Sequence, residues 1–187
     1  MNSKLIKTVT IITMLCVGTL AHATGKNSFT LKSGTFEIGN TAQTLDGIPF
    51  VFEAESSSVI AFEYERELRN DFSIAAGLLK YSNKIISGSS TSSTIDSLHV
   101  MAIGRKYIPI GEHILPYIGI GVGISSANID GIGFGPGFHG VAGLKLRFNK
   151  VSFIVESRYV SAKPKDIYST AVDISGSGVF AGASLHF

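Results

Sequence analysis

The chain has a single cysteine, no tryptophan and few charged residues. Of its 187 residues one is cysteine, none is tryptophan, and charged residues make up 16%. The single cysteine, Cys16, lies near the N-terminus, so the rest of the chain offers no disulfide, no thiol nucleophile and no cysteine metal site. The 16 basic and 14 acidic residues nearly balance. This charge balance gives no indication of a nucleic-acid partner.

Long apolar runs are also missing beyond the N-terminal region, although the mean hydropathy is +0.30. No stretch of about 18 apolar residues is found there, so a membrane helix does not account for the apolar composition. A soluble domain of this length usually carries more charge. The apolar side chains must therefore be accommodated in another way.

Residues 1–23 have the features of an export signal. Lys4 and Lys7 give a positive start, the following stretch is mostly apolar, and Ala21-His22-Ala23 supplies a small-x-small cleavage pattern. We expect this segment to be removed and residues 24–187 to form one domain. The cysteine in the apolar stretch leaves a lipoprotein signal as an alternative, which is disfavoured because the two residues before it are larger than that peptidase prefers.

Apolar and polar residues alternate with a period of two through the rest of the chain. In the segment 117–125, Ile118, Ile120, Val122 and Ile124 share one face, and glycines dominate the other. A strand with this pattern can present one face to lipid and the other to the lumen of a barrel. The segment near residue 33 is irregular, and its faces are not assigned. Eight strands are predicted, at 28–38, 57–67, 71–82, 95–107, 114–126, 137–148, 151–162 and 175–187.

The predicted connections alternate in length. Long ones at 40–56, 83–94, 127–136 and 163–174 alternate with short ones at 68–70, 108–113 and 149–150. Outer-membrane barrels have short periplasmic turns and longer external loops, and we expect the long, Ser- and Gly-rich loops to be mobile. The pattern predicts an all-β, eight-stranded antiparallel up-and-down transmembrane β-barrel. A soluble periplasmic barrel with its polar face outward is the structural alternative.

Several segments resemble a known group of membrane barrels. They are Pro-Tyr-Ile-Gly-Ile-Gly-Val-Gly at 116–123, Gly-Val-Ala-Gly-Leu at 140–144, Val-Glu-Ser-Arg-Tyr-Val at 155–160, and the last strand ending in Phe187. With them the chain resembles the small outer-membrane β-barrels that include OmpW-like and OmpA-transmembrane-domain-like proteins. The resemblance implies a bacterial outer-membrane location, contact with outer-membrane lipids and lipopolysaccharide, and recognition of Phe187 by the outer-membrane assembly machinery.

The inward face of the predicted strands carries charges of both signs. Eight strands leave a lumen just wide enough to be filled by side chains, so we expect a salt-bridged polar core, with Glu156 meeting Lys145 on the neighbouring strand. A constriction that gates small solutes or protons is the functional alternative. The predicted lumen charges are Glu63, Glu65, Arg105, Lys145, Arg147, Glu156 and Arg158.

The residues do not form a complete active site. In the lipid A deacylases, which are enzymatic barrels of similar architecture, the nucleophilic serine follows a histidine by two residues. Here Ser161 follows Tyr159, and a serine without a base in hydrogen-bond reach is a poor nucleophile. His139 lies on another predicted strand, and the histidines do not have the spacing of metal ligands. We expect no enzymatic activity, no metal and no cofactor.

Two classes of function therefore remain beside a deacylase-like hydrolase that lacks the expected histidine. The first is a passive envelope component, or a narrow porin-like channel for small or apolar molecules. The second is a surface protein whose external loops bind a host molecule or another surface ligand. The same barrel supports many functions, so the architecture alone does not choose between them.

Overall fold

The computed structural model describes residues 27–39, 41–45, 48–54, 56–87, 91–128, 134–165 and 173–187. The predicted export signal at 1–23 lies outside these residues. No helix in the described ranges is long and apolar enough to cross a membrane. The strands are β1 (Asn27–Ile38), β2 (Thr41–Leu45), β3 (Ile48–Ala54), β4 (Ser57–Glu67), β5 (Phe72–Ser87), β6 (Thr91–Tyr107), β7 (Ile114–Asn128), β8 (Phe134–Phe148), β9 (Val151–Ala162) and β10 (Gly176–His186).

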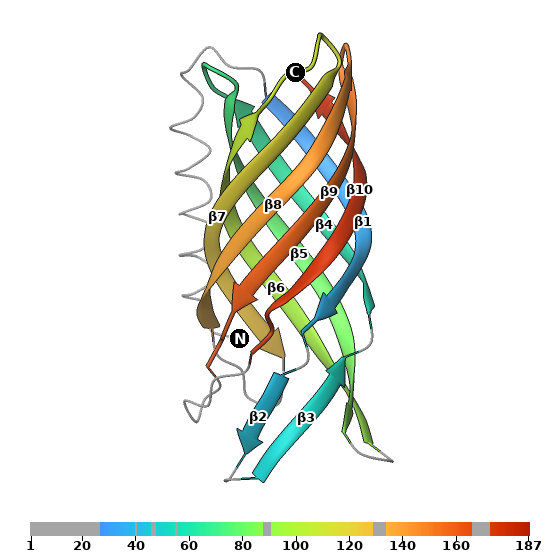
Figure 1. Cartoon of the computed structure of the whole chain (residues 1–187), viewed down its shortest axis with the longest axis vertical. Coiled ribbons are helices and arrows are strands. Elements are labelled where there is room, and N and C mark those ends of the chain that lie inside the picture. Colours follow the sequence, from blue (N-terminus) through green and yellow to red (C-terminus); the bar gives the residue numbers. More distant parts are fainter. Residues whose placement is uncertain are drawn as a thin grey trace.

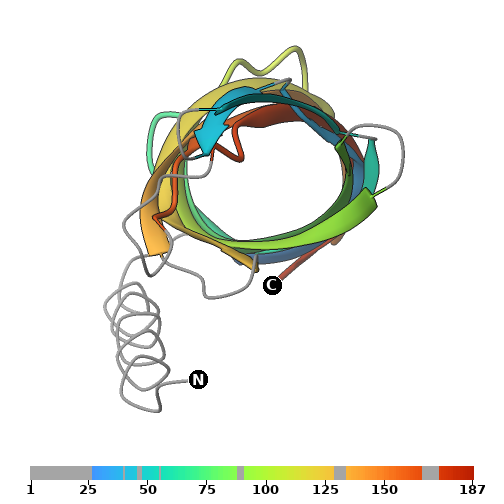
Figure 2. The same cartoon turned by 90° about the horizontal axis from the view of Figure 1, so that it is seen from below.

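Eight of these strands close into a barrel (Figure 1). β1 pairs with β4 on one side and with β10 on the other, and every pairing around the ring is antiparallel. The pairing of β5 with β6 closes the sheet, and Figure 2 shows the resulting ring along its axis. The predicted eight-stranded antiparallel barrel is confirmed, with each predicted strand in its place.

The remaining two strands, β2 and β3, form a hairpin beyond one end of the barrel (Figure 1). β3 joins the sheet through the pairs Glu53↔Ile86 and Ala54↔Ile85 on β5. The prediction of a loop at 40–56 is therefore wrong. The prediction of a loop at 83–94 is also wrong for most of its length, because β5 continues to Ser87 and β6 begins at Thr91. Strands pair through backbone hydrogen bonds and need no alternating apolar face to do so. A prediction based on that alternation therefore missed these extensions.

The short connections all lie at the end of the barrel that holds the C-terminus. Asn70, Asp71 and Asn149 have φ values of 60°, 60° and 52° in two of these turns, and Gly111 has φ 72° in the third. Asn and Asp adopt this left-handed conformation more readily than other residues with a side chain. The three connections predicted to be short therefore lie together at one end of the barrel, opposite the four predicted to be long, of which 83–94 is mostly strand. We call this end periplasmic and the opposite end, which carries β2 and β3, extracellular.

The outer wall of the barrel is apolar. Ile118, Ile120, Val122 and Ile124 all face outward, and Ile120 is 80% exposed. Near the periplasmic end, Phe29 on β1 lies 5.7 Å from Phe62, with the distance measured between ring centroids. Such an outward apolar band with aromatic residues near its edge is typical of barrels that cross a membrane.

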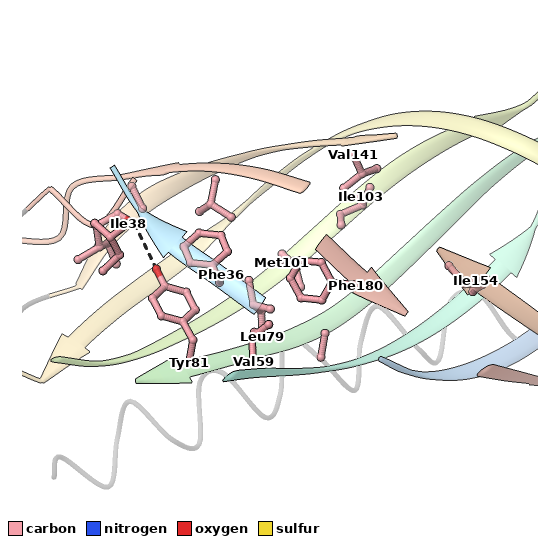
Figure 3. Close-up of a cluster of buried hydrophobic side chains, with 14 of the residues drawn as sticks. Phe36, Ile38, Val59, Leu79, Tyr81, Met101, Ile103, Val141, Ile154 and Phe180 are labelled. Atoms are coloured by element: carbon pink, nitrogen blue, oxygen red, sulfur yellow. Dashed lines mark hydrogen bonds between the residues drawn. The ribbon is translucent and has the colours of Figure 1, made fainter. Parts of the chain in front are cut away.

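The inside of the barrel has two zones. Charged and hydroxyl side chains fill the periplasmic half, whereas apolar and aromatic side chains fill much of the half toward the extracellular end (Figure 3). The apolar zone includes Phe36, Val59, Leu79, Tyr81, Met101, Val160 and Phe180, each no more than 3% exposed. Any path along the barrel axis has to pass both zones.

Candidate functional site

Two carboxylates form the centre of the charged zone. Glu63 on β4 lies 2.9 Å from the ammonium of Lys32 and 2.6 Å from the guanidinium of Arg105. Glu156 on β9 lies 2.8 Å from Lys32, 3.4 Å from Arg105 and 2.5 Å from Arg158. Arg158 also pairs with Glu63. Five side chains from β1, β4, β6 and β9, three of them cationic and two anionic, thereby pair with one another across the lumen.

A second cluster of side chains, around the carboxylate of Glu65, lies next to this centre, toward the periplasmic end. The ammonium of Lys145 is 2.7 Å from Glu65, and Arg105 is 3.8 Å from the same residue. Ser73 donates a hydrogen bond of 2.5 Å to Glu65, and Tyr107 donates another to it. Arg105 thus links the two groups into one ion-pair network. Buried charges need this degree of pairing, because a charge left without a partner in a low-dielectric interior is costly.

Tyr117 on β7 joins the ion-pair network, and its ring lies where a side chain on Gly143 would otherwise be. Its hydroxyl donates a hydrogen bond of 2.6 Å to Glu156. A Cβ atom on Gly143 would lie 2.6 Å from both the hydroxyl oxygen and the adjacent ring carbon of Tyr117. The guanidinium of Arg105 lies 5.4 Å from the centre of the Tyr117 ring. Gly143 is therefore needed for the phenol to reach Glu156.

Six of the seven predicted lumen charges lie in this network, and one does not. Arg147 is half-buried at the periplasmic rim, where it pairs with Glu67. It is the penultimate residue of β8, so it extends beyond the packed interior. The six charges inside the lumen are Glu63, Glu65, Arg105, Lys145, Glu156 and Arg158, each no more than 3% exposed.

The predicted contact between Glu156 and Lys145 is wrong. In the register of β8 and β9, Gly143 lies opposite Glu156, and Lys145 lies opposite Ile154. Lys145 is therefore nearer the periplasmic end, where its ammonium binds Glu65. Sequence alternation assigned both residues to the inward face, but it carried no information on their depth in the lumen.

Lys32 is the network residue that the sequence analysis missed. It is 1% exposed and contacts both central carboxylates. On β1, Ser28, Thr30 and Lys32 face inward, while Phe29 and Leu31 face outward. The regular alternation of these five residues is the feature of the sequence that could have identified Lys32 as an inward residue. It was obscured by Ser33 and Thr35, which are polar but face outward.

Aromatic rings close the lumen on the extracellular side of the network. The rings of Phe36 on β1 and Tyr81 on β5 stack with centroids 4.4 Å apart (Figure 3). Tyr81 stacks in turn on His99, whose Nε2 lies 2.9 Å from the Tyr81 hydroxyl and whose Nδ1 lies 2.6 Å from Oγ of Ser125. His139 packs edge-on against His99 at 5.8 Å. We call Phe36, Tyr81, His99 and His139 the aromatic plug.

The structure separates the two residues of the hydrolase hypothesis. His139 is buried in the aromatic plug, whereas Ser161 lies on β9 with the register partner Phe138, which is 62% exposed on the outer wall. Successive residues of a strand point to opposite faces, so His139 and Ser161 face opposite sides of the wall. Within the described ranges, no three His, Cys, Asp or Glu side chains are grouped to hold a metal ion.

The comparisons with known proteins rest on the fold. No family model matches the sequence, and no curated protein matches it either. Among solved structures, the outer membrane protein OprG from Pseudomonas aeruginosa aligns with a TM-score of 0.70 at 13% identity, over 90% of this chain and 98% of OprG. The chain has the fold of the small OmpW-like outer-membrane barrels.

Two further members of this fold align over similar lengths. Neisserial surface protein A gives a TM-score of 0.64 at 13% identity, over 87% of this chain and 97% of that protein. Outer membrane protein W from E. coli gives 0.52 at 15% identity, over 89% of this chain and all of that protein. Because the sequence identities are this low, these alignments show a shared fold and do not assign this chain the role of any one of these proteins.

The C-terminal residue of this small outer-membrane barrel lies at its periplasmic end. Phe187 is exposed, and its ring stacks on Phe29 with centroids 5.3 Å apart. Its backbone N–H donates to the carbonyl of Asn27 at 2.9 Å, and its own carbonyl accepts from Asn27 at 3.1 Å. The ring is thus accessible next to the seam between β1 and β10. Recognition of Phe187 by the assembly machinery stays a prediction.

Proposed function

We propose that this protein is a non-enzymatic outer-membrane barrel with a sealed lumen. The barrel holds β2, β3 and the extracellular ends of β5 and β6 at the cell surface, and we call these strands the platform. The filled lumen carries the proposal. The ion-pair network and the aromatic plug lie in series along the barrel axis, and their side chains are almost completely buried. An open porin instead has a water-filled interior.

The extracellular end supports a role at the surface. β5 and β6 pair as far as Ser87↔Thr91, and the β2–β3 hairpin is attached to β5 on the extracellular side of Ser57, where β4 begins. These strands hold their backbones in a fixed ladder, which is a suitable base for contacts with a surface ligand. A function as surface-interaction protein is therefore favoured over a narrow channel for small or apolar molecules.

Solute permeability tests the sealed lumen. The protein is reconstituted in vesicles, which are then placed in isotonic arabinose, and swelling is followed by light scattering. A general porin serves as the positive control and empty vesicles as the negative control. We expect the swelling rate of empty vesicles. Swelling at a porin-like rate would show an open lumen and would contradict the proposal.

Surface display tests the platform. An epitope inserted between β2 and β3 is expected to bind antibody on intact cells. The matched control carries the same epitope in the Asn149–Lys150 turn, at the opposite end of the barrel, and is expected to bind antibody only after permeabilisation. The reverse pattern would show that the orientation is wrong.

A further inference from the structure

The outer wall is polar on one side of the barrel, where β1, β10 and β9 lie side by side (Figure 1). Beyond Leu31, the outward residues of β1 are Ser33, Thr35 and Glu37, and all three are exposed. On β7 the outer wall instead stays apolar as far as Ile124. Polar groups that face hydrocarbon without partners are costly, so a polar partner would stabilise the β1–β10–β9 face.

The polar groups of this face have no partners among the described residues. The Glu37 carboxylate on β1 and the hydroxyls of Ser157 and Tyr159 on β9 make no side-chain hydrogen bond or ion pair there. A depression of about 200 Å³ lies between β1 and β9, over β10. Its lining includes Thr35, Glu37, Ser157, Ser177 and Val179. No outward residue of β10 from Ser177 to Ala183 is larger than valine, so another protein can approach this strand closely.

The register of the strands gives the depth of each residue in the membrane. A path from Glu37 through the paired residues of β10, β9 and the following strands returns to β1 at Asn27, ten residues nearer the periplasm. Such a stagger accompanies the tilt of strands in a closed barrel. The eight steps share this descent, so the two steps from β1 to β9 descend by two to three residues. Thr35 pairs through Val179 with Ser157, and it is therefore level with Tyr159, two positions further along β9.

Residues that are level with each other on β1 and β9 match in chemistry. Near the periplasmic end an aromatic residue is level with an aromatic one, and next to it an aliphatic residue is level with an aliphatic one. Further toward the extracellular end, hydroxyl groups are level with hydroxyl groups, and the carboxylate is level with a hydroxyl. The level pairs are Phe29 with Phe153, Leu31 with Val155, Ser33 with Ser157, Thr35 with Tyr159, and Glu37 with Ser161.

We propose that this face binds a second copy of the chain, with a two-fold axis over β10, an inference that rests on the outer-membrane location. Two-fold dimers use the same patch on both subunits. Because both barrels enter the membrane in the same direction, the axis is parallel to the barrel axes. A residue on β1 of one copy therefore meets the level residue on β9 of the other copy.

This contact gives each polar group of the face a partner. The hydroxyls of Tyr159 and Ser161 of the partner subunit donate hydrogen bonds to Glu37. Ser33 exchanges a hydrogen bond with Ser157 of the partner subunit, and the Tyr159 ring of the partner subunit enters the depression next to Thr35. The two Glu37 carboxylates lie on opposite sides of the axis, with both copies of β10 between them, so they do not repel each other closely.

The match between β1 and β9 favours a second copy over a bound lipid. A lipid molecule would need polar groups on the wall, but it would not require that two strands of the same chain agree in chemistry at each depth. A two-fold contact does require this agreement, because each strand has to fit the other one.

Cysteine cross-linking in membranes tests the position of the axis. Ala181 lies on β10, so in the dimer it faces the same residue of the partner subunit. In a Cys16→Ser background, Ala181→Cys is oxidised with copper phenanthroline and analysed on a non-reducing denaturing gel. Ala102→Cys is the matched control, because Ala102 is an exposed alanine at a similar depth on β6, on the opposite side of the ring. We expect at least ten times more cross-linked dimer from Ala181→Cys than from Ala102→Cys.

A mixed cross-linking experiment tests the pairing of β1 with β9. Ser33→Cys and Ser157→Cys are expressed together as chains with different affinity tags, each in the Cys16→Ser background. We expect disulfides between the two variants, because Ser33 of one copy meets Ser157 of the other. Each variant expressed alone is expected to form few disulfides, because the two copies of either residue lie on opposite sides of the axis.

Self-association of the full-length barrel is measured by sedimentation equilibrium in density-matched detergent. We expect a dimer for the natural sequence. Ala181→Trp is expected to weaken the dimer at least tenfold by keeping the two β10 strands apart, whereas Ala102→Trp leaves it unchanged. Tyr159→Phe, which removes one hydroxyl per copy, is expected to weaken it at least threefold. Heat-dependent gel migration confirms that each variant is folded.

Three results would overturn the proposal: equal cross-linking of Ala181→Cys and Ala102→Cys, stronger cross-linking of Ser33→Cys with itself than with Ser157→Cys, or a monomer at every protein concentration, with or without retained lipopolysaccharide. None of these results changes the swelling and epitope experiments, so failure of the dimer is distinguishable from failure of the proposed function. If the protein is not an outer-membrane barrel, the epitope experiment fails as well.

Discussion

Replacing Glu156 by glutamine tests whether buried ion pairs hold the lumen together. The change keeps the size of the side chain and removes one of the two carboxylates facing Lys32, Arg105 and Arg158. Glu63 stays 2.9 Å from Lys32 and 2.6 Å from Arg105, so three cations then share one central carboxylate. Breaking a buried ion pair typically costs about 3–5 kcal/mol. Because Glu63 still compensates part of the charge, we expect the free energy of unfolding to fall by about 3 kcal/mol.

The matched control is Glu67→Gln, which removes the same charge at the periplasmic rim. Glu67 pairs with Arg147, and both side chains are about 20% exposed. Water screens such a pair, so we expect a loss of no more than about 1 kcal/mol. The assay is urea-induced unfolding in phospholipid vesicles, with the folded fraction measured by gel migration without boiling. Equal losses for the two variants would refute the reasoning, because the network would then contribute no more than a rim pair.

Three further changes test other parts of the barrel. Gly143→Ala should displace the Tyr117 phenol from Glu156 and destabilise the barrel by about 1–3 kcal/mol through overpacking, measured in the same unfolding assay; no change would show that the glycine is not needed. Phe36→Ala should remove the ring stacked on Tyr81 and cost about 3–5 kcal/mol, whereas a loss below about 1 kcal/mol would show a loosely packed plug. Deletion of Phe187 should lower the amount of folded protein in the outer membrane while leaving refolding from urea into detergent intact; unchanged assembly in cells would contradict its role as a signal.

The sequence predicted the barrel because lipid imposes a simple rule on each strand. Every second residue between Ile118 and Ile124 has to be apolar, and this regularity is visible without a structure. The alternation also assigned Glu63 and Glu156 to the inside. The β2–β3 hairpin was missed because strands beyond the membrane are free of that rule.

The partners within the lumen could not be read from alternation. Depth along the barrel axis depends on the register and tilt of neighbouring strands, which placed Lys145 next to Glu65 and away from Glu156. The face of Lys32 was obscured for a related reason. Ser33 and Thr35 face outward although they are polar.

The most direct test of the membrane-spanning barrel is the reactivity of an Ile120→Cys variant with a water-soluble maleimide. Cys16 is the one natural cysteine, so a Cys16→Ser background gives a single labelling site. Ile120 is 80% exposed on the outer wall, and lipid covers it if the barrel crosses the membrane. We predict no labelling in isolated membranes and full labelling after unfolding in hot detergent. Rapid labelling of a folded, water-soluble protein would contradict the account. The assignment of the polar face of each strand to the lumen would then have to be reconsidered.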